Sequence, residues 1–289
     1  MQPLVEHRLE LGGFGTRALE LEGDGPPVLL LHGFADSADT WRQVLDRLAR
    51  RNRRALAVDL PGFAKADRLD RDAPVLDQLR TFAHAAVEHL AAEQGGPVVV
   101  MGNSLGGCTA LRVAEDPALP VLAVVPVAPA GFDMPRWFSI IERDPFVRTL
   151  LASPLPLPGP LMRVFVGEAY RQLAFARPRA VAAELVNAFT EHHLDRRAVR
   201  RYLDNGRRML PELSGCFALE RVTCPVMLVW GDRDRMVTHR GSRWVLEALP
   251  ATRFELYEGV GHCPQVEVPD RLVEDLESFL LAPAPAVAG

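Results

Sequence analysis

Two patterns of apolar and polar residues run along this chain. Near the N-terminus, VEHRLEL and TRALELE alternate apolar and polar residues on either side of a GGFG turn, which predicts an antiparallel hairpin open to water on one face. Further along, PVLLLHG, RALAVDLPG, PVVVMGNS, LAVVPVAPAG and PVMLVWGDRD are almost uniformly apolar and end in Gly, Pro or acidic residues. Runs of this kind are typical of strands that are buried on both faces of a parallel sheet.

Segments with helical spacing separate these runs, at about 39–50, 73–93, 104–115, 238–249 and 266–281. The alternation of strands and helices predicts an α/β fold with a doubly wound, mostly parallel sheet that is entered through the N-terminal antiparallel hairpin. We expect residues 1–130 and 211–281 to form this core together.

The strand pattern stops between residues 131 and 210, where a string of helical segments is interrupted by the proline-rich SPLPLPGP. An all-helical insertion between two strands of one sheet predicts an inserted helical lid, or cap, folded over the edge of the sheet. Residues 282–289, APAPAVAG, contain too few large apolar side chains to pack, so they are predicted to form a mobile tail.

The composition is that of an ordinary globular protein, with 48% hydrophobic and 24% charged residues. The 33 basic and 37 acidic residues are spread along the chain, so we expect neither a nucleic-acid nor a membrane partner, and we interpret the arginines of 196–208 as the solvated face of helices. The N-terminal MQPLVEHRLELGG resembles neither a secretory signal nor an anchor, which favours a cytoplasmic location. The four cysteines form no CxxC pair, and no metal site is predicted.

Residues 102–106, GNSLG, fit the G-x-S-x-G pattern, with strand-like VVVM before them and helix-like CTALRVA after them. A sharp strand-to-helix turn strains the backbone of Ser104 and leaves no room for side chains at Gly102, Gly106 and Gly107. The hydroxyl would then lie exposed beside a helix N-terminus, whose amides favour negative charge. The alternative interpretation is a serine that merely caps a helix in a tight turn.

A serine becomes a useful nucleophile when a neutral imidazole lies within reach and a carboxylate fixes the tautomer of that imidazole. Asp232 and Asp234 directly follow the PVMLVW run, and His262 lies in a glycine-flanked loop after RFELYE. The chain order Ser, Asp, His is the one expected for this architecture. Residues two apart in an extended segment point the same way, so the periodicity leaves the choice between the two aspartates open.

Such a reaction also needs hydrogen-bond donors for the negative oxygen that develops at the attacked carbonyl. The amide of Leu105, at the start of the helix after the serine, is one candidate for this oxyanion hole. The amide of Phe34, in the loop after the LLLHGF run, is the second, and His32 is expected to brace that loop.

Together, LLLHGFADSADTW, AVDLPGFAKAD, GNSLGG, MLVWGDRD and GVGHCPQVEVPDRL resemble the α/β-hydrolase superfamily over nearly the whole chain outside the lid. The resemblance implies that Ser104 is the nucleophile and His262 the general base and acid. It also favours Asp234 over Asp232, because the family places this acid three residues after the strand-ending glycine, here Gly231.

A serine at this position argues against the related dehalogenases and epoxide hydrolases, which use a carboxylate there. The resemblance implies a carboxylesterase that acts on small to medium carboxylic esters through an acyl-enzyme on Ser104, with a small-molecule acyl substrate and no cofactor. The first alternative is a carbon–carbon bond hydrolase of the meta-cleavage-product type, since GNSLGGCTAL is similar to the corresponding segment of those enzymes. Cys263, where those enzymes usually have tryptophan, and a first loop poorer in glycine weaken this alternative.

A cofactor-free perhydrolase or an acyltransferase would change only the molecule that accepts the acyl group. A lid-gated ligand-binding protein of hydrolase fold is the non-enzymatic alternative. Substrate selection is expected from the lid, where four apolar residues follow the LAVVPVAPAG run: Phe132, Met134, Trp137 and Phe138. They either wall an acyl pocket or pack the lid against the core, and the sequence fixes neither the acyl length nor the oligomeric state.

Overall fold

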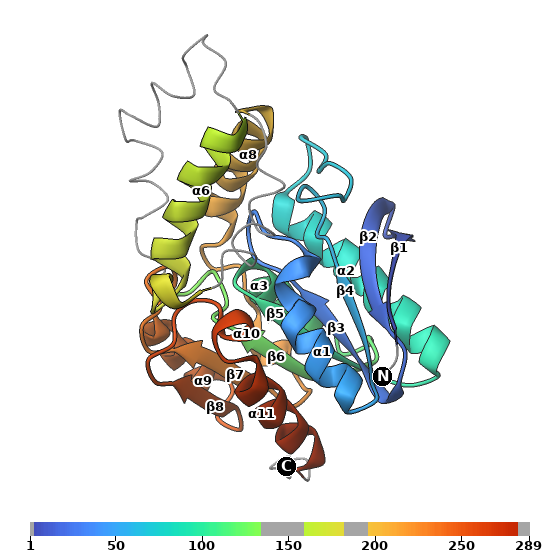
Figure 1. The fold of residues 1–289 in the computed structure, drawn as a ribbon. Helices are drawn as coiled ribbons and strands as arrows, with labels where there is room; N and C mark the ends of the chain where they lie inside the picture. Colours follow the sequence, from blue (N-terminus) through green and yellow to red (C-terminus); the bar gives the residue numbers. More distant parts are fainter. Residues whose placement is uncertain (1–2, 134–158, 182–195, 283–289) are drawn as a thin grey trace.

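The computed structural model describes residues 3–133, 159–181 and 196–282, and it is built around one eight-stranded sheet (Figure 1). The strand order is β1-β2-β4-β3-β5-β6-β7-β8. β1 and β2 form the predicted antiparallel hairpin, β2 also pairs antiparallel with β4, and all later pairs are parallel. The strands are β1 (Leu4–Leu11), β2 (Phe14–Leu21), β3 (Asp24–Leu31), β4 (Arg53–Val58), β5 (Val98–Asn103), β6 (Val121–Val127), β7 (Met227–Gly231) and β8 (Arg253–Tyr257).

Helices cover both faces of this sheet, and each of the five predicted core helices is present with its ends shifted by a few residues. The helices are α1 (Arg42–Arg50), α2 (Val75–Gln94), α3 (Leu105–Ala114), α6 (Gly159–Ala174), α8 (Arg196–Glu212), α9 (Ser242–Ala248), α10 (Pro264–Glu267) and α11 (Pro269–Leu281). The predicted mostly parallel α/β fold with an N-terminal hairpin is therefore confirmed. Within the described ranges, each helix is too short or too polar to cross a membrane.

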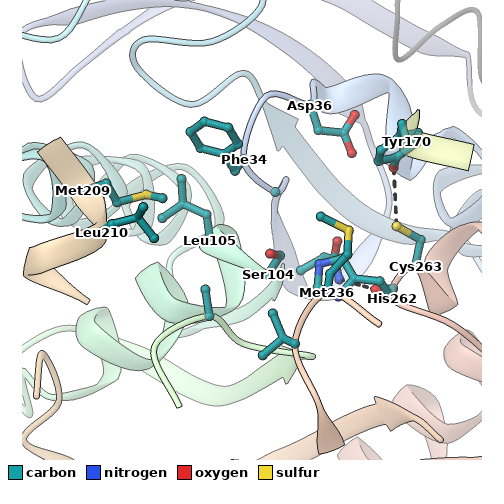
Figure 2. A pocket seen from close by; sticks show the side chains of 14 residues that line it. Phe34, Asp36, Ser104, Leu105, Tyr170, Met209, Leu210, Met236, His262 and Cys263 are labelled. Atoms are coloured by element: carbon teal, nitrogen blue, oxygen red, sulfur yellow. Dashed lines mark hydrogen bonds between the residues drawn. The ribbon is translucent and has the colours of Figure 1, made fainter. Parts of the chain in front are cut away.

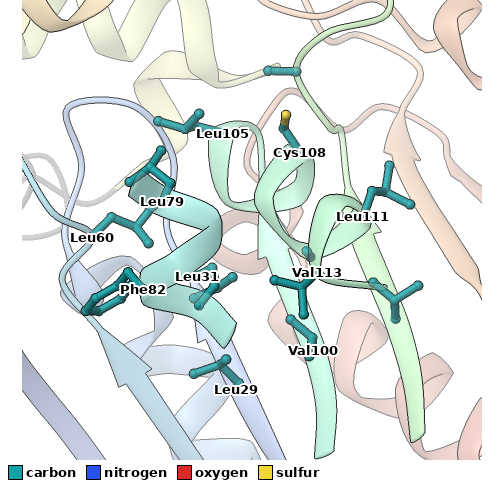
Figure 3. Packing of buried hydrophobic residues seen from close by; sticks show 14 of the residues in the cluster. Leu29, Leu31, Leu60, Leu79, Phe82, Val100, Leu105, Cys108, Leu111 and Val113 are labelled. Atoms are coloured by element: carbon teal, nitrogen blue, oxygen red, sulfur yellow. The ribbon is translucent and has the colours of Figure 1, made fainter. Parts of the chain in front are cut away.

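Neighbouring residues of the inner strands belong to different hydrophobic clusters, which explains why the central parts of these strands are apolar on both faces. In β3, Leu29 and Leu31 pack in the cluster that α2 and α3 cover (Figure 3). Val28 and Leu30 of the same strand pack in the cluster that α1 and α11 cover on the other face. Successive strand side chains point to opposite faces, and burying each such side chain contributes about 1.5–3 kcal/mol to folding.

Between β6 and β7 the described residues include two long helices, α6 and α8 (Figure 1), and short 3-10 turns at Pro178–Ala180 and Leu219–Arg221. α8 is attached to the core because the ring of Tyr202 lies 5.7 Å from that of Phe63, and Asn205 Nδ2 donates to Gly62 O at 3.2 Å. The proposed lid limits, 131 and 210, stay predictions. The predicted tail falls outside the described residues from position 283 onward.

Candidate active site

Ser104 occupies the sharp turn between β5 and α3. Its backbone angles are φ 55° and ψ −113°, a combination that costs free energy for any residue except glycine. Three hydrogen bonds hold the turn: Ser104 N donates to Val127 O at 2.9 Å, and Ser104 O accepts from Cys108 N at 2.9 Å and from Ala130 N at 3.0 Å. Strand β6 and the start of α3 therefore fix the strained serine in place.

The glycines around Ser104 are required by close backbone approaches, as the sequence predicts. A Cβ atom on Gly102 would lie 2.2 Å from Gly106 O, and one on Gly106 would lie 2.1 Å from Leu31 O. Both obstacles are backbone atoms of the sheet or helix, which cannot rotate out of the way. A side chain at either position would therefore push α3 away from the sheet.

We expect Gly106→Ala to lower the free energy of unfolding by about 3 kcal/mol or more, because the added methyl overlaps the end of β3. Urea denaturation followed by circular dichroism measures the change. Gly96→Ala is the matched control, since an added Cβ there meets no atom within 4 Å. Equal stability of the two variants would contradict this account of the turn.

His262 and Asp234 form a buried hydrogen-bonded pair after β8 and β7. His262 Nδ1 lies 2.7 Å from Asp234 Oδ2, and their side chains are 3% and 0% exposed. The other carboxylate oxygen, Oδ1, accepts from Met236 N at 2.8 Å and from Val237 N at 3.0 Å. An ionised carboxylate only accepts, so Nδ1 carries the proton and Nε2 is left as the acceptor of the ring.

Asp232, the other aspartate that follows β7, has a different partner. Its Oδ1 accepts from Gly259 N at 2.6 Å, which ties the loop after β7 to the loop after β8. The geometry therefore separates the two aspartates that periodicity could not: Asp234 contacts the imidazole, and Asp232 braces the loop.

The loop that carries His262 is also attached to the residue before Ser104. His262 N donates to Ala174 O at 2.7 Å, and Asn103 Nδ2 donates to His262 O at 2.9 Å. Gln265 Nε2 in turn donates to Asn103 Oδ1 at 3.1 Å. Sequence reasoning missed the role of Asn103, although a polar side chain at the end of a buried strand needs such partners.

Asn103→Ala should lower the free energy of unfolding by about 1–3 kcal/mol, because it removes the side-chain donor of the buried His262 carbonyl and one acceptor of the Gln265 amide, which also donates to Thr40 Oγ1 at 3.3 Å. Urea denaturation measures this loss. Thr109→Val serves as the control, since the Thr109 hydroxyl donates to a carbonyl within its own helix, Leu105 O, and its removal should cost less than about 1 kcal/mol. A larger loss of stability in Thr109→Val than in Asn103→Ala would contradict the proposed role of Asn103 in holding the His262 loop.

Ser104 and His262 line the same pocket. Figure 2 shows Ser104 at its centre, with Phe34 and Leu105 on one side and Met236 and His262 on the other. The loop after β3 touches the serine, since a Cβ on Gly33 would lie 3.3 Å from Ser104 Cβ. The other described lining residues are Gly33, Asp36, Asn103, Ala130, Tyr170, Met209, Leu210, Val237 and Cys263.

The loop after β3 is braced by His32, as its position suggests. Its Nε2 accepts from Leu60 N at 2.8 Å, and its Nδ1 lies 2.7 Å from Gly33 O. Both ring nitrogens therefore take part in structural hydrogen bonds, with Nδ1 as the donor. This arrangement fixes the backbone that leads into Phe34.

Phe132, at the start of the insertion, packs against another aromatic side chain. Its ring stacks on Phe217 with the centroids 4.4 Å apart, and it is not among the described residues that line the pocket. Met134, Trp137 and Phe138 lie outside the described residues. Tyr170 of α6 and two residues of α8 line the pocket instead, and the sequence could not place them because their contacts depend on how the inserted helices pack.

Cys263, next to His262, is a buried thiol whose Sγ lies 3.4 Å from the Tyr170 hydroxyl oxygen. Burial raises the pKa of the Cys263 thiol, and burial also raises the pKa of Tyr170. Both groups are therefore neutral at pH 7, and Cys263 is not present as the thiolate that a nucleophilic cysteine requires.

The comparison with known families supports the fold. The model of the alpha/beta hydrolase family matches residues 28–275, most of the chain. The chain belongs to this family.

The relatives of this chain carry names that refer to different substrates. The chain is 26% identical to a 2-hydroxy-6-oxo-6-(2'-aminophenyl)hexa-2,4-dienoic acid hydrolase of Metapseudomonas resinovorans, over 96% of this chain and 91% of that one. It is also 26% identical to a pimeloyl-[acyl-carrier protein] methyl ester esterase of Nitrosomonas europaea, over 90% of this chain and 98% of that one. The crystal structure of CarC, a serine hydrolase involved in carbazole degradation, matches with a TM-score of 0.74 and 25% identity, over 96% and 99% of the chains.

Proposed function

We propose that this protein is a serine hydrolase that cleaves small to medium carboxylic esters through an acyl-enzyme on Ser104. The observation that carries the proposal is the buried His262–Asp234 hydrogen bond in the pocket that also contains Ser104. His262 Nε2 takes the proton of the Ser104 hydroxyl while Oγ forms a bond to the ester carbonyl carbon. The same proton is then given to the leaving alcohol as the ester C–O bond breaks.

Water completes the reaction by attacking the acyl-enzyme, with His262 again taking and returning one proton. Asp234 holds the tautomer in which Nε2 is free to accept and stabilises the imidazolium that forms. The amides of Phe34 and Leu105 act as donors to the negative carbonyl oxygen, and the position of Leu105 at the start of α3 adds the favourable end of the helix dipole.

An uncharged acyl group suits the pocket. The described lining residues are mainly apolar, among them Met209, Leu210, Met236 and Val237, and they include neither Lys nor Arg to neutralise a substrate carboxylate. Since α6 and α8 both contribute to the lining, the insertion at 131–210 acts as a lid that selects the acyl group. These features favour esters over anionic dienoates.

Hydrolysis of a carbon–carbon bond is the second candidate, and the similarity to the dienoic acid hydrolase and to CarC favours it. It would use the same three side chains on a substrate that carries a carboxylate. Perhydrolysis or acyl transfer would begin from the same acyl-enzyme with another acceptor. A ligand-binding protein without activity would show no turnover on any of these substrates.

Hydrolysis of p-nitrophenyl butyrate and covalent labelling by a fluorophosphonate probe test the proposal. We expect release of nitrophenolate and labelling of the wild-type protein. Parallel assays follow the loss of colour of 2-hydroxy-6-oxo-6-phenylhexa-2,4-dienoate. A much higher kcat/KM for the dienoate than for the ester would show that carbon–carbon cleavage, and not ester cleavage, is the function of the protein. The absence of both labelling and turnover would favour a ligand-binding protein.

A further inference from the structure

A second hollow, of about 720 Å³, lies between the loop before α2 and helix α8, apart from the pocket of Ser104. We call it the arginine groove. Among the described residues that line the groove, Asp204 is the only acidic one. Its arginines are Arg68 and Arg71 of the loop and Arg197, Arg200, Arg201, Arg207 and Arg208 of α8. In a chain with a formal net charge of −4, this is a local concentration of positive charge.

The two walls of the groove are attached to each other and to the core. Arg208 Nη2 donates to Asp70 O at 2.6 Å and to Ala73 O at 2.7 Å, so α8 is bonded to the loop. The Tyr202 hydroxyl accepts from Ala64 N at 3.2 Å on the buried side of the same helix. The groove is therefore preformed, and the backbone carbonyls that hold Arg208 leave its positive charge unneutralised.

Two acidic side chains near the groove, among the residues that the structure describes, already have other partners or are screened by water. Arg207 pairs with Asp204 at 3.1 Å, but both side chains are more than half exposed, so the pair is screened by water and salt. Asp67, Asp70 and Asp72 alternate with the loop arginines and are not among the described residues that line the groove. Asp67 Oδ2 accepts from Gly15 N at 2.8 Å, which draws that carboxylate toward the N-terminal hairpin.

We propose that the arginine groove binds a small molecule that carries two or more phosphate groups. Guanidinium groups form paired hydrogen bonds to phosphate oxygens, and several of them around one anion offset its loss of hydration. The volume is that of a small-molecule site, and the arginines surround a hollow, whereas a membrane surface would need a flat or protruding basic face. The ligand is either a free diphosphate or the diphosphate part of a larger molecule such as an acyl carrier.

The groove shares helix α8 with the Ser104 pocket. Met209 and Leu210, which directly follow Arg208, line that pocket. A diphosphate-bearing acyl carrier bound in the groove would therefore contact the same helix as the acyl group. Phosphate binding itself does not depend on the proposed esterase activity, since it can be measured without turnover.

Isothermal titration of the full chain with inorganic pyrophosphate, ADP and coenzyme A tests the proposal. We expect all three to bind at low salt and to bind less tightly at high salt. The double variant Arg71→Glu/Arg197→Glu should bind each at least about tenfold more weakly. Arg51→Glu, an exposed charge reversal outside the groove, is the control and should bind like the wild type.

Tighter binding of coenzyme A than of ADP would identify an acyl carrier, and equal binding would identify the diphosphate itself. Failure of all three ligands to bind at low salt would overturn the proposal, as would unchanged affinity in the double variant. Phosphatidylglycerol vesicles provide the last arm. The protein is sedimented with these vesicles in the absence and presence of excess pyrophosphate. Binding to the vesicles that pyrophosphate does not reverse would assign the arginines to a membrane surface instead. Arg71→Gln/Arg197→Gln repeats the test if the glutamate variant does not fold.

Discussion

Replacement of Ser104 by alanine should lower kcat for p-nitrophenyl butyrate by on the order of a millionfold. The acyl-enzyme cannot form without the hydroxyl, and the remaining acceleration would come from binding and from the amides of Phe34 and Leu105 alone. Labelling by the fluorophosphonate probe should disappear with the activity. Steady-state kinetics and gel fluorescence measure the two effects.

The fold should survive this change, because alanine is smaller than serine at a position that is only 8% exposed. Ser242→Ala is a suitable control, since Ser242 is another buried serine and lies at the start of α9. It should keep wild-type activity and labelling. Labelling that persisted in Ser104→Ala would show that another residue is the nucleophile.

Much of the fold could be predicted because the strand pattern is strong. The central parts of the inner strands are apolar on both faces, as two covered faces require, and each strand is followed by a segment with helical spacing. The turn at Ser104 could be predicted for a related reason: few residues except glycine fit where backbone atoms lie within about 2 Å of a would-be Cβ, so Gly102 and Gly106 reveal the geometry in the sequence itself.

Long-range contacts could not be predicted in the same way. The bond from Asn103 to the His262 carbonyl joins residues 159 positions apart, and no local pattern encodes it. The arginines of α8 have the spacing of an ordinary solvated helix face, which is how the sequence alone is interpreted. Only the packing of α8 against the loop that carries Arg68 and Arg71 shows that they surround a hollow.

Asp234→Asn should lower kcat by about ten-thousandfold, if Asp234 is the acid that orients His262. Two backbone amides, Met236 N and Val237 N, donate to Asp234 Oδ1. In the variant they select the amide oxygen for this position, because the amide nitrogen cannot accept. The NH2 group is then directed at His262 Nδ1 in place of Oδ2, so that Nδ1 becomes the acceptor and Nε2 carries the proton.

An imidazole in that tautomer presents a proton to the Ser104 hydroxyl and cannot remove one, although every side chain keeps its place. The fluorophosphonate reaction should slow together with kcat, while the free energy of unfolding changes far less than the rate. Asp232→Asn is the matched control, because the Asp232 carboxylate accepts from Gly259 N and an amide oxygen can do the same. The kcat of this variant should stay within about tenfold of wild type. A larger loss in Asp232→Asn than in Asp234→Asn would reverse the assignment of the acid, since the tautomer of His262 depends on the carboxylate that contacts Nδ1.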